Sequence, residues 1–265
     1  MIGVYKTKKL DGSTYFRASI TYKNKHISLG SSSDENTAFE MYKTAADLLY
    51  STVTIDDHTE NSPLNFSMWV VLINFRDNGV YFKNPIYLKK RFFLYYLNKD
   101  TVLKFDTDDL FYYSQHRIQA RGGHLFCENY GTQVSLGSRY GIRPFAVKSR
   151  DYRFINDDDT DFRYHNIEII NQYYGVEKDS RRIPPVYKAR ITVRSVYTLG
   201  IYETEEAAAI AVNKAIDMLS KTTLRKKSRV PNYIDTLPAS KYADIYSSIE
   251  LPERFMKLIN DHLAE

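Results

Sequence analysis

An acidic loop from Asp151 to Ile170, DYRFINDDDTDFRYHNIEII, carries the residue types in this chain that are best suited to chemistry. Asp157, Asp158, Asp159 and Asp161 supply oxygen ligands of the kind that hard divalent cations prefer. Such a cation can neutralise the charge that builds up on a phosphate while a nearby base activates water. The acids lack the glycine-containing spacing of an EF-hand, and a run of acids is also typical of a solvated turn. The loop is therefore a candidate site for phosphate chemistry, with a purely structural turn as the alternative.

Composition and charge set the first limits on function. With 265 residues the chain is long enough for two or three domains, and a hydrophobic fraction of 43% is enough to bury real cores. The net charge of +5 and the pI near 9.0 suit a polyanionic partner without requiring one. The single cysteine, Cys127, excludes a disulfide framework and argues against a cysteine-based zinc site.

Nothing in the sequence points to a membrane. The longest apolar stretch, Met68 to Ile73, is far too short to cross a bilayer, and the first residues lack the apolar run of a signal peptide. We therefore expect a soluble, cytoplasmic protein without a membrane partner.

An internal repeat is the clearest feature of the sequence. Gly3 to Gly30 reads GVYKTKKLDGSTYFRASITYKNKHISLG, and Gly175 to Gly200, about 170 residues later, reads GVEKDSRRIPPVYKARITVRSVYTLG. The match continues through the alanine-rich stretch that follows each Leu-Gly pair. Such self-similarity predicts two copies of one structural unit.

Each copy predicts three strands and a helix. Apolar and polar residues alternate from Phe16 to Lys23 and from Tyr187 to Arg194, as expected of strands with one buried face. An alanine stripe follows at helical spacing in both copies. Ser32 and Glu35 have the spacing of a capping box at the start of the first helix, and Thr204 precedes two acids at the start of the second. We expect each helix to cover the apolar face of a small sheet and to leave the other face open.

The open faces are predicted to be basic and to contact DNA. Cations outnumber acids in both copies, which favours a surface that faces phosphates over one that is merely solvated. A further basic run follows the second helix. The candidate DNA-contacting residues are Lys6, Lys8, Lys9, Arg17, Ser19, Thr21, Lys25, His26, Ser28, Arg181, Arg182, Lys188, Arg190, Thr192, Arg194, Thr198, Arg225 and Lys226.

Both copies resemble the APETALA-type DNA-binding domain of plant ethylene-response factors. The resemblance rests on the initial Gly-Val, the aromatic-x-Ala-x-Ile strand, the Leu-Gly that closes the third strand and the alanine-rich helix. It implies a three-stranded sheet that lies in the major groove, with Arg17, Arg190 and Arg194 suited to guanine. The plant family's paired tryptophans are missing, and Phe16 and Tyr187 occupy one such place, so the family's base code does not carry over.

The middle segment, from about Val102 onward, resembles the HNH nuclease domains that phages and bacteria often fuse to APETALA-type modules. Ile155 to Asp158 matches the family's Asp-His-Ile-Asn-Gly loop, and Asp161 to Ile167 matches the helix pattern that follows it. The resemblance implies a ββα-metal fold with a histidine base just before the Ile-Asn pair. Phe154 stands at that position, and the family's earlier histidine falls near Gly137, so both histidines are replaced.

The rest of that motif is present only in part. Asn156, Asp158 and Asn166 remain, and such residues can hold a loop or cap a helix without catalysing a reaction. The other histidines of the segment are His116, His124 and His165, and a lone histidine is more typical of a surface or structural position than of a metal ligand. We therefore expect no catalytic residue, no bound metal and no cofactor, with Mg²⁺ needed only if the nuclease is active.

The sequence thus predicts an α+β protein in which two modules of a three-stranded antiparallel sheet plus helix flank a central degenerate ββα-metal (HNH-like) domain. The predicted domains are 1–62 (APETALA-type), 63–172 (HNH-like) and 173–265 (APETALA-type with a C-terminal helical extension). The predicted function is sequence-biased binding of double-stranded DNA without cutting, as in a transcriptional regulator derived from a homing endonuclease and associated with a bacterial nucleoid. Two alternatives stay open: an active, metal-dependent HNH endonuclease and a phage-encoded module that binds another protein.

Overall fold

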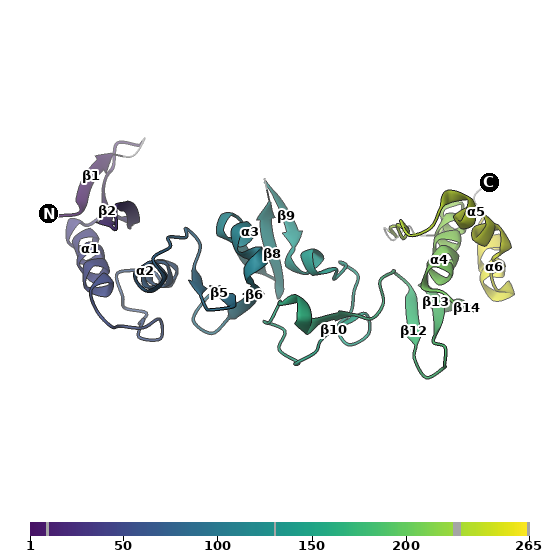
Figure 1. The fold of residues 1–265 in the computed structure, drawn as a ribbon. Helices are drawn as coiled ribbons and strands as arrows, with labels where there is room; N and C mark the ends of the chain where they lie inside the picture. The colour runs from purple at the N-terminus through teal and green to yellow at the C-terminus, as the bar shows by residue number, and fades with distance from the viewer. Residues whose placement is uncertain (9–10, 130, 225–228, 264–265) are drawn as a thin grey trace. The chain divides into compact units, whose positions relative to one another are not determined.

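The computed structural model describes residues 1–8, 11–129, 131–224 and 229–263. Among these residues the fold is mixed α+β, with four three-stranded sheets, one two-stranded sheet and six α-helices (Figure 1). The chain divides into two compact units, one formed by Met1–Leu136 with Asp158–Asn166 and the other by Gly137–Asp157 with Ile167–Glu265. Each unit holds one copy of the repeat, and the division into three domains stays a prediction.

The first unit opens with the first copy of the repeat. Its antiparallel sheet consists of β1 (Val4–Lys8), β2 (Thr14–Tyr22) and β3 (Lys25–Ser32), and α1 (Glu35–Leu49) packs on one face of it. Ala18, Ile20, Ile27 and Leu29 are buried against the alanines of α1. The predicted arrangement of three strands and a covering helix is therefore confirmed for this copy.

Helix α1 begins differently from the expected capping box. The carboxylate of Asp34 accepts hydrogen bonds from the backbone N of Thr37 at 2.7 Å and from its hydroxyl at 2.9 Å, so Asp34 is the N-cap. Ser32 still belongs to β3, and its hydroxyl accepts from the backbone N of Asp34 at 3.1 Å. The capping box with Ser32 and Glu35 is therefore wrong, because the strand runs on until two residues before the cap.

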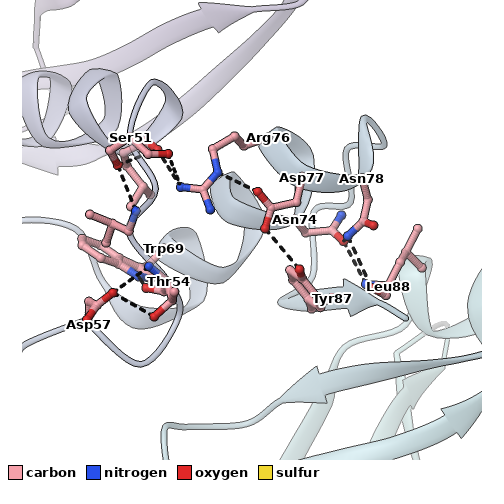
Figure 2. A network of polar contacts seen from close by, with 12 residues as sticks. Ser51, Thr54, Asp57, Trp69, Asn74, Arg76, Asp77, Asn78, Tyr87 and Leu88 are labelled. Atoms are coloured by element: carbon pink, nitrogen blue, oxygen red, sulfur yellow. Dashed lines mark hydrogen bonds and ion pairs between the residues drawn. The ribbon is translucent and has the colours of Figure 1, made fainter. Parts of the chain in front are cut away.

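Helix α2 (Phe66–Asn78) joins this copy to the rest of the first unit. Nη1 of Arg76 donates to the carbonyls of Leu48 and Ser51, each at 3.0 Å, which satisfies carbonyl groups at the end of α1 (Figure 2). Trp69 donates from its indole N to the carbonyl of Thr54 at 3.0 Å (Figure 2). The short apolar stretch of the sequence, Met68 to Ile73, lies within this helix, and every residue from Trp69 to Phe75 is buried, so the helix is covered on all sides.

An aromatic core fills the remainder of the first unit. Phe93, Tyr95, Phe105 and Tyr113 are each at most 1% exposed, and the rings of Phe105 and Tyr113 lie 4.4 Å apart. The elements that carry this core are β4 (Ile86–Leu88), β5 (Phe92–Tyr96), β6 (Val102–Asp106), α3 (Leu110–Gln115), β7 (Ile118–Arg121), β8 (His124–Asn129) and β9 (Thr132–Ser135). This region is therefore rich in short strands, and its core is built largely from aromatic rings.

The acidic loop contains two short strands instead of a strand followed by a helix. In the second unit, β10 (Tyr152–Phe154) pairs in antiparallel fashion with β11 (Ile167–Ile169). The helix expected over Asp161 to Ile167 is only a 3-10 turn at Tyr164–Asn166, so that expectation is wrong. The alternating Ile-Glu-Ile at the end of the loop favours a strand, because β-branched residues lose side-chain freedom in a helix.

The second copy of the repeat occupies most of the second unit. Its elements are β12 (Val176–Asp179), β13 (Val186–Thr192), β14 (Val196–Tyr202) and α4 (Glu205–Ser220), followed by α5 (Ala239–Ser248) and α6 (Glu253–Asn260). The hydroxyl of Thr204 accepts from the backbone N of Ala207 at 3.2 Å and caps α4. Phe255 and Ile259 of α6 are fully buried in the same core as the apolar residues of β13, β14 and α4, which confirms the expected C-terminal helix.

The two copies share one irregularity of the backbone. The register of the central strand shifts between Ala18 and Ser19 in the first sheet and between Ala189 and Arg190 in the second. Directly after each shift, a backbone N–H donates to the carbonyl of the glycine that precedes the first strand, from Ser19 to Gly3 at 2.9 Å and from Arg190 to Gly175 at 2.7 Å. Both glycines have positive φ angles, of 72° and 75°. The repeat seen in the sequence is therefore also a repeat of local geometry.

Replacing Gly175 by alanine is expected to destabilise the second unit by roughly 2–4 kcal/mol. The new Cβ would lie 2.4 Å from the carbonyl oxygen of Arg190, and the left-handed backbone is strained for any residue with a Cβ. Chemical unfolding of the full chain measures the change. Gly141→Ala is the matched control, since its φ is 79° but its Cβ would meet only Ile169, at 3.5 Å; we expect a loss of about 1 kcal/mol. Equal losses in the two variants would contradict the proposed role of the close approach.

Candidate nucleic-acid interface

The outer face of the first sheet is defined by the residues that pair across its strands. Directly opposed residues of antiparallel strands point to the same side, so the pairs of Tyr5 with Arg17 and of Thr21 with His26 place these four side chains together. Ser28 lies on the same side through its pairing with Ser19. This side is opposite to Ala18 and Ile20, which face the helix. The outer face therefore carries hydroxyls, an imidazole, aromatic rings and one guanidinium.

Arg17 is the main cationic group of this outer face. It is exposed, and its guanidinium carbon lies 5.4 Å from the centre of the Tyr15 ring. None of the strand residues that the structure places on this face is acidic. Thr21, His26 and Ser28 are also exposed, whereas Ser19, in the central strand, is only 7% exposed. Ser19 therefore offers a partner much less surface than was expected.

Three lysines expected on this face lie on the other side of the sheet. Lys6 pairs with Phe16, which packs against the core, and Lys8 follows at the same phase. Lys25 pairs with Tyr22, and its ammonium lies 5.1 Å from the centre of the Tyr81 ring. The prediction that these lysines share a face with Arg17 is wrong, because lysines near strand ends stay solvated on either side of a sheet. Lys9 lies outside the described residues.

The outer face of the second sheet carries the expected cations together with acids. Pairing places Lys188, Arg190, Thr192 and Thr198 on one side of the sheet, in agreement with the sequence analysis. Glu177 pairs with Lys188 and so shares that side. Its carboxylate lies 2.7 Å from Nη1 of Arg190, with both side chains 40% exposed. A partner that uses Arg190 must therefore compete with an internal counterion.

Further arginines lie in the two turns of the second sheet. Arg181 makes a bidentate pair with Asp179, at 2.9 and 2.8 Å, which holds the pKa of that carboxyl well below its usual range. Arg182 and Arg194 are exposed. Arg225 and Lys226 lie outside the described residues. The turns thus add exposed positive charge at the ends of the second outer face.

The acidic loop presents no base at the position where the nuclease resemblance requires one. Phe154 is 4% exposed, and the ammonium of Lys148 lies 5.6 Å from the centre of its ring. At Gly137, a side chain would have its Cβ 3.1 Å from the Cβ of Ile142, so the position has little room for histidine. Phe154 is therefore a core residue, and Gly137 is closely packed.

Two carboxylates of the loop, those of Asp158 and Asp161, are held by cations of the same chain. Asp158 accepts from Nζ of Lys104 at 2.7 Å and from the hydroxyl of Thr160 at 2.6 Å; these hydrogen bonds lower its pKa to about 2. Asp161 is fully buried and accepts hydrogen bonds from Nε and Nη2 of Arg163, at 2.8 and 2.5 Å. These contacts explain the acids as a way to fix the loop on β6, in line with the structural alternative.

A hydrogen bond from Asn166 completes this arrangement. Nδ2 of Asn166, which is 2% exposed, donates to the carbonyl of Asp161 at 2.9 Å and so closes the turn. Asn156 is exposed. Within the described ranges, no three or more His, Cys, Asp or Glu side chains gather so that they could hold a metal ion. Asn166 therefore acts as a structural residue of the loop.

Comparisons of the chain with family models, with curated proteins and with solved structures found no match. No helix of the described part of the chain is long and apolar enough to cross a membrane.

The second unit also contains a pocket that no pattern in the sequence predicts. Three segments far apart in the sequence line this pocket, with Phe145, Tyr174 and Tyr233 among its walls. Each segment joins an aromatic residue to a proline or to another aromatic, but such pairs are common in loops. Only the fold brings them together.

Replacing Asp158 by asparagine is expected to make the free energy of unfolding less dependent on pH. The folded pKa of about 2 lies below the unfolded value of about 3.9, so the charged form stabilises the fold above pH 4 and this contribution is lost as pH falls toward 2. The contribution of the charged carboxylate to the free energy of unfolding should be at most about 1 kcal/mol, because the side chain is 33% exposed. Chemical unfolding at pH 5 and pH 2.5 measures it. Asp157→Asn, which removes an exposed acid of the same loop, is the control and should behave like the unchanged chain.

Proposed function

We propose that this chain binds double-stranded DNA through the outer faces of its two repeated sheets and does not cut it. The observation that carries the proposal is the shared geometry of the copies, each of which covers one sheet face with a helix and leaves the other face uncovered. A three-stranded sheet of this size can enter the major groove, as other strand-based readers do. The resemblance to APETALA-type domains supports the same use of the sheet.

The chemistry of the first outer face fits such a partner. Arg17 can donate two hydrogen bonds to a guanine or to a phosphate, and hydroxyls beside it can reach either kind of acceptor. The face lacks acidic strand residues among those described, so it does not repel a polyanion. The net charge of +5 adds a favourable long-range attraction. We assign the main contact with DNA to this face.

The second outer face contributes a weaker contact. Its pair of Glu177 with Arg190 must open or shift before Arg190 can reach a base or phosphate. A second contact on the same chain still raises the overall affinity, because its effective concentration near the DNA is high once the first sheet is bound. The proposed function is therefore bidentate binding with a sequence bias set mainly by the first sheet.

The acidic loop supports a protein that does not cut DNA. A missing general base costs a factor of about 10²–10⁴ in rate, and Asp158 and Asp161 are engaged by Lys104 and Arg163. We therefore propose that the loop serves as a scaffold. Regulation of transcription is the proposed outcome of binding.

A protein-interaction module is the second candidate, and one observation favours it. Val196 and Ile201 lie on the outer face of the second sheet and are 57% and 53% exposed. Exposed apolar residues on a sheet face suit a protein partner, although they can also contact thymine methyl groups. The two candidates differ at the first sheet, because only the DNA-binding candidate requires that sheet to bind duplex DNA.

Arg17→Gln is expected to weaken binding to duplex DNA by about tenfold and to reduce the salt dependence by about one counterion. Lys25→Gln is the matched control, because it removes one positive charge from the same copy on the opposite side of the sheet. We expect this control to bind within about twofold of the unchanged chain. Mobility shifts at several salt concentrations measure both effects. Equal losses in the two variants would show that net charge, and not the outer face, governs binding.

The unchanged chain is expected not to nick supercoiled DNA in the presence of Mg²⁺ or Mn²⁺. Phe154→His should not create this activity, because a histidine there would be buried and the nearby acids would stay paired. Gel assays with excess DNA detect catalytic turnover. Nicking by the unchanged chain would overturn the non-cutting proposal. Nicking by Phe154→His alone would mean that the base is the only missing element.

A further inference from the structure

A pocket in the second unit lies among three segments of the chain. Its cavity volume is about 590 Å³. This volume falls within the usual range for small-molecule sites, about 300–1,000 Å³. The segments that line it are 143–145, 172–174 and 229–233, together with Thr192. None of the functions considered so far uses this pocket.

Aromatic rings form its walls. The rings of Phe145 and Tyr174 meet edge to face, with centroids 5.4 Å apart and planes at 72°, so they make a corner. Tyr233 contributes a third ring, which is 82% exposed. A ring that lines a pocket and still lies almost entirely in solvent contributes little to the core. Such a ring is free to stack on a flat ligand.

The floor of the pocket is fixed in place by asparagines. Asn232 accepts from the backbone N of Tyr174 at 2.7 Å and donates to the carbonyl of the same residue at 3.0 Å. Asn213 of α4, which is 4% exposed, binds the backbone N of Asn232 at 2.7 Å and its carbonyl at 2.9 Å. The polar groups of the floor are thus satisfied within the protein. A preorganised floor of this kind favours stacking and shape over hydrogen bonding to a ligand.

The charge of the pocket is positive. Arg143 and Arg229 are the charged residues that line it, and no aspartate or glutamate is among its described lining residues. Arg143 is exposed, and Nη2 of Arg229 donates to the carbonyl of Thr192 at 2.9 Å. Arginines beside aromatic walls suit a ligand that is flat and carries a phosphate. An apolar or cationic ligand would offer no anionic partner to either guanidinium group.

Thr192 connects the pocket with the second outer face. It lines the pocket and, through its pairing with Val196, lies on the same side of the sheet as Arg190 and Thr198. DNA bound to that face would therefore pass close to the pocket. We propose that the pocket binds one unpaired nucleobase with its phosphate, the base against the Phe145, Tyr174 and Tyr233 rings and the phosphate between the two arginines. The placement of that nucleotide within DNA rests on the proposed function.

Fluorescence of 2-aminopurine in the full-length protein tests the proposal. Three probes are used: the free 2-aminopurine nucleoside monophosphate, a mixed-sequence duplex with 2-aminopurine opposite an abasic site, and the same duplex fully paired. We expect quenching and tighter binding for the abasic duplex than for the paired duplex. Tyr233→Ala and Arg143→Gln should each reduce this preference by about tenfold, since one stacked base or one charge-assisted contact supports an effect of that size.

A control tests whether the loss of any exposed tyrosine has the same effect. Tyr50 is also 82% exposed but does not line the pocket and is not on the first outer face, so Tyr50→Ala should leave all three affinities unchanged. Binding of the free nucleotide that depends on Tyr233, without preference for the abasic duplex, would support the pocket and assign it to free nucleotides.

The failures of the two proposals are distinguishable. Binding of paired DNA with no effect of Tyr233→Ala or Arg143→Gln on any probe would overturn the pocket and leave the proposed function intact. Binding of the free nucleotide without binding of either duplex would overturn the proposed function and leave the pocket intact. Loss of all binding by the unchanged chain would overturn both.

Discussion

A hydrogen bond from the central strand to a glycine carbonyl extends the ladder between the first two strands of each repeated sheet. In the first copy the bond runs from Ser19 to Gly3, and in the second from Arg190 to Gly175. It lies one residue beyond the last strand pair on that side, so it helps to fix the register of the first strand against the central strand. A slip of one residue would turn Arg17 toward the helix and bring Ala18 to the surface. The glycine must have a positive φ for the first strand to approach this closely.

The sequence was sufficient to predict the two sheet-and-helix modules, because their apolar residues repeat with the period of the elements that they form. Ala18, Ile27 and Leu29 were expected inside and are buried there. The charged residues were assigned less well. Lys6 and Lys25 were counted with Arg17 by position along the chain, although their phase relative to Val4 and Ile27 places them on the helix side. The alternation of side chains along a strand shows which face each lysine is on. The residue type does not, because a long side chain near a strand end reaches water from either face.

The acidic loop shows a different limit. Its motif was visible locally, but the partner of Asp158 is Lys104, more than fifty residues earlier in the sequence. Whether a carboxylate is available to a metal depends on such distant cations, and no local spacing reports them. The same holds for the pocket, whose walls come from three segments that meet only in the folded second unit. Local patterns therefore predicted elements well and the state of individual charged groups poorly.

The pair of Glu177 with Arg190 has a consequence for the relative affinity of the two sheets. An ion pair that is 40% exposed on both sides is worth little in water, so a stronger partner can displace it at a small cost. A DNA phosphate offers Arg190 a charged and often bidentate partner, and the two acceptors of a guanine edge also match the planar guanidinium. Either contact must first break the internal ion pair, so Glu177 lowers the affinity of the second sheet for both. Arg17 has no acidic strand residue on its own face, and the first sheet therefore supplies most of the affinity.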